Sequence, residues 1–166
     1  MNVSSYPQPW QTAYAHPCPW EQDFAPLSLH GLFEAATAAH GHAPLIDFLG
    51  RRYSYATLLQ EARAFAAGLQ ALGLGKGDRV GLFLPNVPIY VPAYYGAAMA
   101  GCTVVNFSPL YTAAELEAQV ADSGTRILVT VDSSALLPTA LTVLADSPLE
   151  RLLVGSLAAM LPRVQG

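Results

Sequence analysis

The sequence has 166 residues, of which 52% are hydrophobic and 12% are charged, and its formal net charge is −4. A chain of this length can bury a real hydrophobic core, but its few charges leave apolar surface that we expect to meet a partner, a membrane or further polypeptide. No basic stripe is present that could neutralise a phosphate backbone, which excludes nucleic acid as an expected partner.

Residues 1–26 are predicted to form an extended arm, because five prolines and two tryptophans occur there without helical or strand periodicity. The arm lacks the basic and apolar regions of a secretory signal, so the Asn-x-Ser matches at Asn2 and Asn106 are interpreted as chance. Cys18 and Cys102 lie far apart, outside any disulfide or zinc spacing, and favour a reducing cytoplasm.

Two helices and a hairpin are predicted next along the chain. Ser28 is a helix N-cap, and apolar residues follow it at helical spacing as far as His40. Two short strands, at residues 45–49 and 52–53, are joined by a tight turn at Gly50. Ser54 then caps a second helix, which ends at Gly73.

Strands and helices alternate from Arg79 onward. Strands are predicted at residues 79–84, 103–107, 126–131 and 152–154, and helices at 86–100, 112–123 and 137–145. Asn86 is expected to cap the first of these helices, and Thr112 to form a capping box with Glu115 in the second. This alternation predicts an α/β fold with a doubly wound, mainly parallel sheet and helices on both faces, plus the small N-terminal β-hairpin.

The stretch from Val80 to Ala114 contains no charged residue and is long enough to cross a membrane. Prolines and asparagines interrupt it, and basic anchors are lacking on one side, so a buried strand–helix–strand unit is favoured. A membrane-anchored protein that uses this stretch remains an alternative.

Several motifs suggest chemistry but have simpler explanations. Three glycines around Lys76, within residues 73–77, resemble a phosphate loop, but they follow a helix and precede a strand, so a helix C-cap and turn is favoured. His40 and His42 have no third ligand at zinc spacing. Neither cysteine has a nucleophile signature, and no Gly-x-Ser-x-Gly motif indicates a hydrolase.

Asp132 follows a predicted strand at the carboxyl edge of the sheet, where open α/β folds bind ligands, although helix capping also explains it. The uncharged loops at residues 85–88 and 106–112 leave the same edge and could line an apolar pocket. Capping by Asn86 and Thr112, with ordinary packing, is the alternative explanation. No residue is assigned a catalytic, cofactor-binding or metal-binding role.

Three stretches have a characteristic order and separation: GRRYSYATL at residues 50–58, LGLGKGDRVGLFLPN at 72–86 and AGCTVVNFSPLYTAAELEAQVADSGTRILV at 100–129. Together they resemble the N-terminal region of the adenylate-forming enzymes, and most closely the long-chain fatty-acid–CoA ligases. The resemblance covers residues 27–155. One departure is Ser108, where the family more often has Asn.

The resemblance implies that residues 27–155 are the N-terminal α/β subdomain of an AMP-binding ligase and that residues 156–166 are the truncated start of its next element. In that family a fatty carboxylate attacks the α-phosphate of ATP to form an acyl-adenylate, and the thiol of coenzyme A then displaces AMP. Magnesium, a Thr/Ser-Gly-rich loop ending in Pro-Lys-Gly and a lysine of a mobile C-terminal domain serve this chemistry. These motifs do not occur between Met1 and Gly166.

The resemblance therefore implies ATP, Mg and coenzyme A for the parent enzyme, and a fragment that is inactive and holds no cofactor. A relative that acts on aryl or short-chain acids remains open, as does a free-standing α/β interaction module. The parent is expected in the cytoplasm, with peripheral contact to the inner face of the membrane left open. The fragment is expected to self-associate, because sheet edges and helix faces meant for later sequence are bare.

Overall fold

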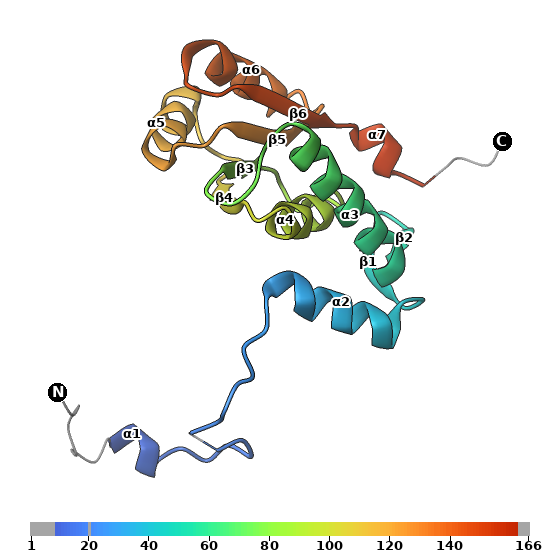
Figure 1. The fold of residues 1–166 in the computed structure, drawn as a ribbon. Coiled ribbons are helices and arrows are strands. Elements are labelled where there is room, and N and C mark those ends of the chain that lie inside the picture. The colour runs from blue at the N-terminus through green and yellow to red at the C-terminus, as the bar shows by residue number, and fades with distance from the viewer. Residues whose placement is uncertain (1–8, 20, 163–166) are drawn as a thin grey trace.

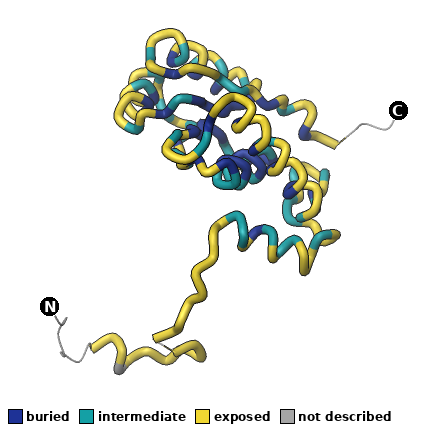
Figure 2. The backbone as a smooth tube through the Cα atoms, viewed as in Figure 1, coloured by how far each residue is buried: buried dark blue, intermediate teal, exposed yellow. Residues whose placement is uncertain are grey.

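The structure is a computed structural model that describes residues 9–19 and 21–162. At its N-terminal end, helix α1 (Pro9–Thr12) and the chain as far as residue 28 lie apart from the α/β body (Figure 1). The described side chains of this segment are exposed (Figure 2). The predicted arm therefore contains one helical turn, which Pro9 can begin because proline suits the first helical position. Residues 1–8 of the arm lie outside the described ranges.

Helix α2 (Leu29–His40) begins at the predicted cap. The Ser28 Oγ accepts a hydrogen bond from the Gly31 amide at 3.1 Å, which satisfies one of the free donors of the first turn. Helix α3 (Tyr55–Ala71) begins in the same way, because Ser54 Oγ accepts from the Thr57 amide at 3.2 Å. Both predicted N-caps are confirmed.

The predicted hairpin lies between these two helices. Strand β1 (Pro44–Phe48) pairs antiparallel with β2 (Arg51–Ser54). The turn has positive φ at both Leu49 (53°) and Gly50 (88°), the hand that matches the twist of the flanking strands. Gly50 adopts this backbone freely because it has no side chain, whereas positive φ is unfavourable for the neighbouring Leu49. The Asp47 carboxylate supports the turn by accepting from the Gly50 amide at 3.1 Å.

Four parallel strands form the main sheet in the order β4-β3-β5-β6. They are β3 (Arg79–Phe83), β4 (Thr103–Phe107), β5 (Ile127–Val131) and β6 (Arg151–Gly155), connected by α4 (Tyr90–Met99), α5 (Ala113–Ser123) and α6 (Leu137–Asp146). Helices α3 and α4 cover one face and α5 and α6 the other (Figure 1). All five residues of β5 are buried. The predicted doubly wound α/β fold is confirmed.

The start of α4 differs from the prediction. Asn86 does not cap this helix: the cap residue is Ile89, which makes no side-chain hydrogen bond. Pro88 contributes to this difference, because a proline disfavours helical backbone at the residue before it, here Val87. The chain turns instead, with the Val87 amide bonded to the Pro85 carbonyl at 2.9 Å. Pro92 lies in the first turn of the helix, where a missing amide proton removes no intrahelical bond.

The close packing of α4 on α3 depends on Gly96. A Cβ atom at this position would lie 2.6 Å from the Ala62 carbonyl oxygen and 2.9 Å from the Phe65 side chain. No side chain larger than hydrogen fits there without a shift of one helix. Gly96 therefore sets how closely α3 and α4 can approach.

An ion-pair network joins three elements at the amino edge of the sheet. The Arg126 guanidinium donates to the Asp78 carboxylate and to both oxygens of Glu150, with the shorter Glu150 contact at 2.6 Å. The Asp78 carboxylate also accepts from the Gly75 amide at 2.8 Å. These bonds fix the turn around Lys76 to the strands beside it.

The uncharged stretch from Val80 to Ala114 folds as strand, helix and strand, with β3, α4 and β4 in it. None of the helices in residues 9–19 and 21–162 combines the length and the hydrophobicity needed to span a bilayer.

Candidate functional site

Open α/β folds bind ligands at the carboxyl edge of the sheet, so a functional site is expected there. The loop after β3 and the loop after β5 leave neighbouring strands toward opposite faces, which is the topology at which open α/β folds bind ligands. A short helix, α7 (Leu157–Met160), follows β6 at the same edge. The hydrogen bonds of α7 determine which side chains at this edge are already engaged.

Asp132 lies at the end of β5 and caps α7. Its Oδ1 accepts a hydrogen bond from the Leu157 amide at 2.7 Å, and this bond lowers the pKa of the Asp132 carboxyl. Helix α6, which directly follows Asp132, begins after Leu136 without a side-chain cap. Asp132 therefore caps a helix, as the capping interpretation predicts, but the helix is α7 and not α6. Its bonding partner lies 25 residues further along the chain. Sequence spacing gives no signal for such a distant partner.

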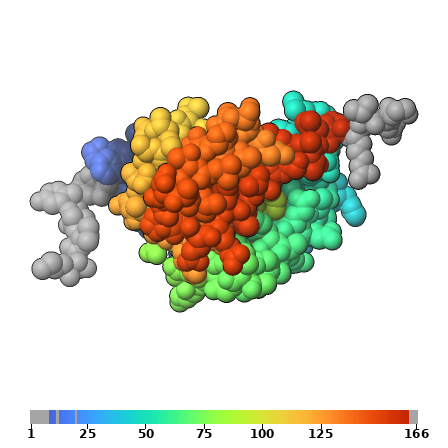
Figure 3. All heavy atoms as spheres, turned by 90° about the horizontal axis from the view of Figure 1, so that it is seen from above, coloured from blue at the N-terminus to red at the C-terminus, as the bar shows by residue number. Residues whose placement is uncertain are grey.

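The C-terminal end of α7 is held by the hairpin. The Tyr53 hydroxyl donates to the Met160 carbonyl oxygen at 2.8 Å, and Arg51 donates to the carbonyl oxygens of Ala159 and Leu161. The Arg51 guanidinium also stacks on the Tyr53 ring, 4.7 Å from its centroid. In Figure 3 the red α7 accordingly lies beside the cyan hairpin. These two residues, which the sequence analysis did not single out, form what we call the α7 clamp.

A small cavity of about 220 Å³ lies between the α7 clamp, α3 and the loop after β3. Glu61 lines it with Arg51 and Tyr53, and partial burial raises the pKa of the Glu61 carboxyl. The remaining lining is largely apolar, from Pro88, Ile89 and Met160.

The two uncharged loops behave differently. Asn86, Val87 and Pro88 line a cavity of about 330 Å³ together with the hairpin, as the pocket interpretation predicts. In the other loop Phe107 is buried in the core and Thr112 forms its predicted capping box, with its amide 2.9 Å from Glu115 Oε2. That loop therefore follows the capping interpretation at Thr112 and the packing interpretation at Phe107, but packing is wrong for Leu110, whose side chain is 88% exposed.

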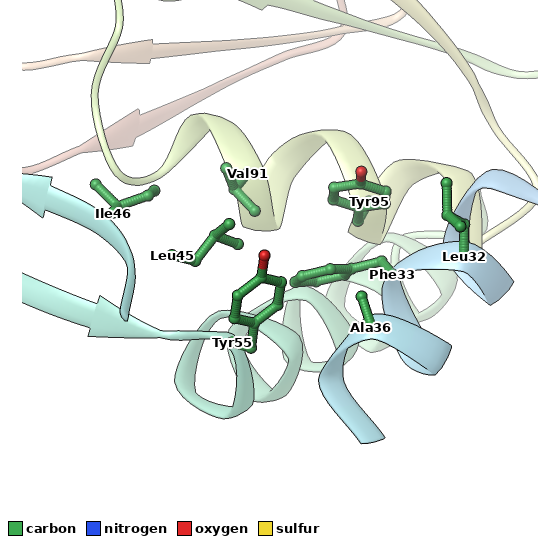
Figure 4. Close-up of a pocket in the computed structure, with 8 residues that line it drawn as sticks. All are labelled: Leu32, Phe33, Ala36, Leu45, Ile46, Tyr55, Val91 and Tyr95. Carbon is green, nitrogen blue, oxygen red and sulfur yellow. The ribbon is translucent and has the colours of Figure 1, made fainter. Parts of the chain in front are cut away.

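A larger apolar pocket of about 390 Å³ lies on the α2 side of the molecule (Figure 4). Elements α2, β1, α3 and α4 supply its lining: Leu32, Phe33, Ala36, Leu45, Ile46, Tyr55, Val91 and Tyr95. The Phe33 and Tyr95 rings stack with centroids 4.3 Å apart. Among the described residues no charged side chain lines this pocket, so they offer it shape and apolar contact without a group that could do chemistry.

The other sequence candidates do not form sites. Gly73 ends α3 with a φ of 79°, and the loop around Lys76 lies at the amino edge, which excludes the phosphate-loop interpretation. His40 and His42 belong to no group of three potential metal ligands among the described residues. Burial raises the pKa of the Cys102 thiol, which makes it a poor nucleophile.

The carboxyl edge does not fit ATP with Mg²⁺. Beside this edge the guanidinium of Arg51, on β2 of the hairpin, is engaged by carbonyl oxygens, and the carboxylate of Asp132 at the end of β5 is engaged by an amide. Lys76, the single lysine of the sequence, lies at the opposite edge. A triphosphate needs cationic side chains, and neither the engaged Arg51 nor the distant Lys76 supplies one at this edge.

Comparison with known proteins gives consistent matches. The family model described as "AMP-binding enzyme" matches residues 33–160. A long-chain-fatty-acid–CoA ligase from Bacillus subtilis is 35% identical over 155 residues, which span 93% of this chain and 27% of the relative. The crystal structure of a long-chain-fatty-acid-CoA ligase from Archaeoglobus fulgidus superposes with a TM-score of 0.70 at 25% identity, over 84% of this chain and 30% of that one.

The structure of the N-terminal domain of FACL13 from Mycobacterium tuberculosis matches with a TM-score of 0.68 and 26% identity. The match covers 84% of this chain but only 38% of that domain. The chain thus spans a minor part of each of these proteins.

Proposed function

Because this chain belongs to the family of AMP-binding enzymes, we propose that it is the N-terminal part of an ATP-dependent long-chain-fatty-acid–CoA ligase of cytoplasmic lipid metabolism. The observation that carries the proposal is the 35% identity to the Bacillus subtilis ligase across 93% of the chain. A long-chain fatty acid is favoured over an aryl or short-chain acid, since this match extends over nearly the whole sequence.

Within such an enzyme, residues 27–155 would be the N-terminal α/β subdomain, residues 1–26 an arm and residues 156–166 the start of the next element. Two features support this division. Helix α2 begins at Leu29 behind its Ser28 cap, and β6 ends at Gly155. The α7 clamp then fixes the chain that leaves β6.

The role we propose for these residues is to position other parts of the ligase. Fatty acid, ATP, Mg²⁺ and coenzyme A are substrates and cofactor of the parent enzyme, and the cations that handle phosphate would come from polypeptide outside the chain. The poor fit of the carboxyl edge to a triphosphate supports this division of labour.

The test is a comparison of residues 1–166 with the product of the complete reading frame. Each is incubated with ATP, Mg²⁺, coenzyme A and either palmitate or 4-coumarate, and AMP release is measured. The longer protein is expected to release AMP with palmitate, and residues 1–166 with neither acid. AMP release by residues 1–166 above background would refute the proposed role, and activity with 4-coumarate alone would refute the substrate class.

Two accompanying proposals concern residues 1–166 as an isolated molecule. We expect self-association, because large apolar side chains such as Leu110 (88% exposed), Leu141 (51%) and Val154 (47%) face solvent. Light scattering that shows a sharp monomer at high concentration would contradict it. Peripheral contact with a membrane stays an open proposal, supported by the same exposed apolar side chains, and a chain that stays wholly in the supernatant after sedimentation of lipid vesicles would contradict it.

A further inference from the structure

Helix α7 is a single turn that distant residues hold in place. A helix of four residues has no stability of its own, because isolated helices shorter than about 12–15 residues are marginal in water. The Leu157 amide at its start donates to Asp132, and the carbonyl oxygens at its end accept from the α7 clamp. The position of residues 157–161 is therefore set by bonds that reach across 25 to 110 residues of sequence.

The α7 clamp has a stronger partner close by. Arg51 and Glu61 line the same cavity, and a carboxylate attracts a guanidinium more strongly than a neutral carbonyl does. Among the described residues, however, Arg51 forms no ion pair with Glu61. It donates instead to the carbonyl oxygens of Ala159 and Leu161. The arrangement thus favours the hold on α7 over an ordinary surface ion pair.

Helix α7 also contacts the switch point of the sheet, where the loops after β3 and β5 leave neighbouring strands toward opposite faces. Two side chains lie over Gly155, the last residue of β6: a Cβ atom there would be 2.7 Å from Ile89 Cδ1 and 3.3 Å from Met160 Cε. Ile89 belongs to the chain between β3 and α4. A shift of α7 therefore changes the packing around Ile89, which couples the hairpin to the loop after β3.

The switch point is where open α/β folds bind ligands. Asp132 at the end of β5 holds the start of α7, and Met160 at its end packs beside Ile89, so α7 bridges the two loops that leave this point. The Tyr53 hydroxyl and one Arg51 nitrogen are already engaged by carbonyl oxygens of α7. With these atoms the α7 clamp acts on a ligand at the carboxyl edge through α7 and not by direct contact.

We propose that Arg51 and Tyr53 are positioning residues of the ligase reaction, which fix α7 and through it the loop after β3 at the ligand-binding edge. The inference rests on the proposed function. A misplacement of about 1 Å can lower a rate about 100-fold even when the altered residue lies far from the chemistry. Loss of one of several bonds to α7 is a smaller disturbance, so we expect a loss of about tenfold in kcat.

The test measures kcat and KM for the product of the complete reading frame, with ATP, Mg²⁺, coenzyme A and either palmitate or 4-coumarate. The variants are Tyr53→Phe, Arg51→Met and Arg51→Lys. The matched control is Arg126→Gln, which breaks the ion pairs at the opposite edge of the sheet. Rates are expressed per folded molecule, at a temperature where circular dichroism shows each variant to be folded. A merely structural role then leaves kcat unchanged.

Tyr53→Phe and Arg51→Met should each lower kcat about tenfold and leave KM within about twofold of the parent value, because the loss concerns alignment and not substrate binding. Arg51→Lys should recover most of the loss, since an ammonium group can donate to the same carbonyl oxygens. The double variant should lose less than the product of the two single losses, because both residues hold one helix. Arg126→Gln should keep the parent kcat.

Unchanged kcat per folded molecule in Tyr53→Phe and Arg51→Met would overturn the inference alone, and so would an equal loss in Arg126→Gln. A rise in KM at constant kcat would also contradict a positioning role. A complete protein that releases no AMP with either acid, or a reading frame that ends at residue 166, would refute the proposed function and this inference together.

Hydrogen exchange tests the coupling without an activity measurement. Amides of Tyr90, Val91 and Ala93 bond to carbonyl oxygens of residues 87–89 in the loop after β3. These amides should exchange faster in Tyr53→Phe than in the parent, whereas Arg126→Gln should leave them as they are. Equal exchange in Tyr53→Phe and the parent would contradict coupling through α7.

Discussion

The contact between α3 and α4 should be sensitive to one added methyl group at Gly96. In Gly96→Ala the new Cβ would lie 2.6 Å from the Ala62 carbonyl oxygen, a backbone atom that cannot rotate away. One helix must shift, and such overpacking costs about 1–3 kcal/mol. Alanine in place of glycine in a helix gains about 0.5–1 kcal/mol, so the net loss of stability should be about 1 kcal/mol at the middle of both ranges and about 2.5 kcal/mol at most.

Gly68→Ala is the matched control. Gly68 lies within α3, and a Cβ atom there meets nothing within 4 Å. Only the propensity gain applies, so this variant should be more stable by about 0.5–1 kcal/mol. Urea denaturation followed by circular dichroism measures both variants, with a lower midpoint for Gly96→Ala, a higher one for Gly68→Ala and unchanged slopes. A Gly96→Ala protein as stable as the parent would refute the close-packing argument.

Three further predictions concern single interactions. Tyr53→Phe removes the donor to the Met160 carbonyl and should cost about 0.5–1.5 kcal/mol in urea denaturation, with faster hydrogen exchange at residues 157–160. Thr112→Ala removes the α5 cap and should cost about 0.5–2 kcal/mol, and an unchanged midpoint would contradict the capping role. Hydrogen bonding from Arg126 lowers the pKa of Glu150 below its ordinary value of 4.5, so the stability from this pair is present above that pH and is lost as the pH falls through the folded-state pKa. Arg126→Gln should therefore weaken the acid dependence of the urea midpoint, and an unaltered pH profile would argue against the pair.

Features that depend on neighbours in sequence could be predicted. Ser28, Ser54 and Thr112 cap helices because a side-chain oxygen reaches an amide three residues later, which spacing alone reveals. The parallel order followed from strands too far apart in sequence for tight turns. Asn86 was the exception, since Pro88 disfavours helical backbone at Val87, the residue that would begin a helix capped by Asn86.

Features that depend on distant residues could not be predicted. Asp132 bonds 25 residues away and Tyr53 bonds 107 residues away, and no local pattern indicates either partner. The apolar pocket of Figure 4 is likewise a property of three-dimensional packing, because Ile46 and Val91, which both line it, come from different elements. The sequence indicated surplus apolar surface but not its location.

The bond from Tyr53 to Met160 also has a consequence for the order of folding. It closes a loop of 107 residues, and such long loops carry a high entropic cost until the intervening contacts have formed. Because α7 follows all four strands of the sheet in the sequence, it is synthesised after them and can dock on the hairpin only then. Docking of α7 should therefore be one of the last events in the folding of this chain, and it reports that the whole sheet has assembled.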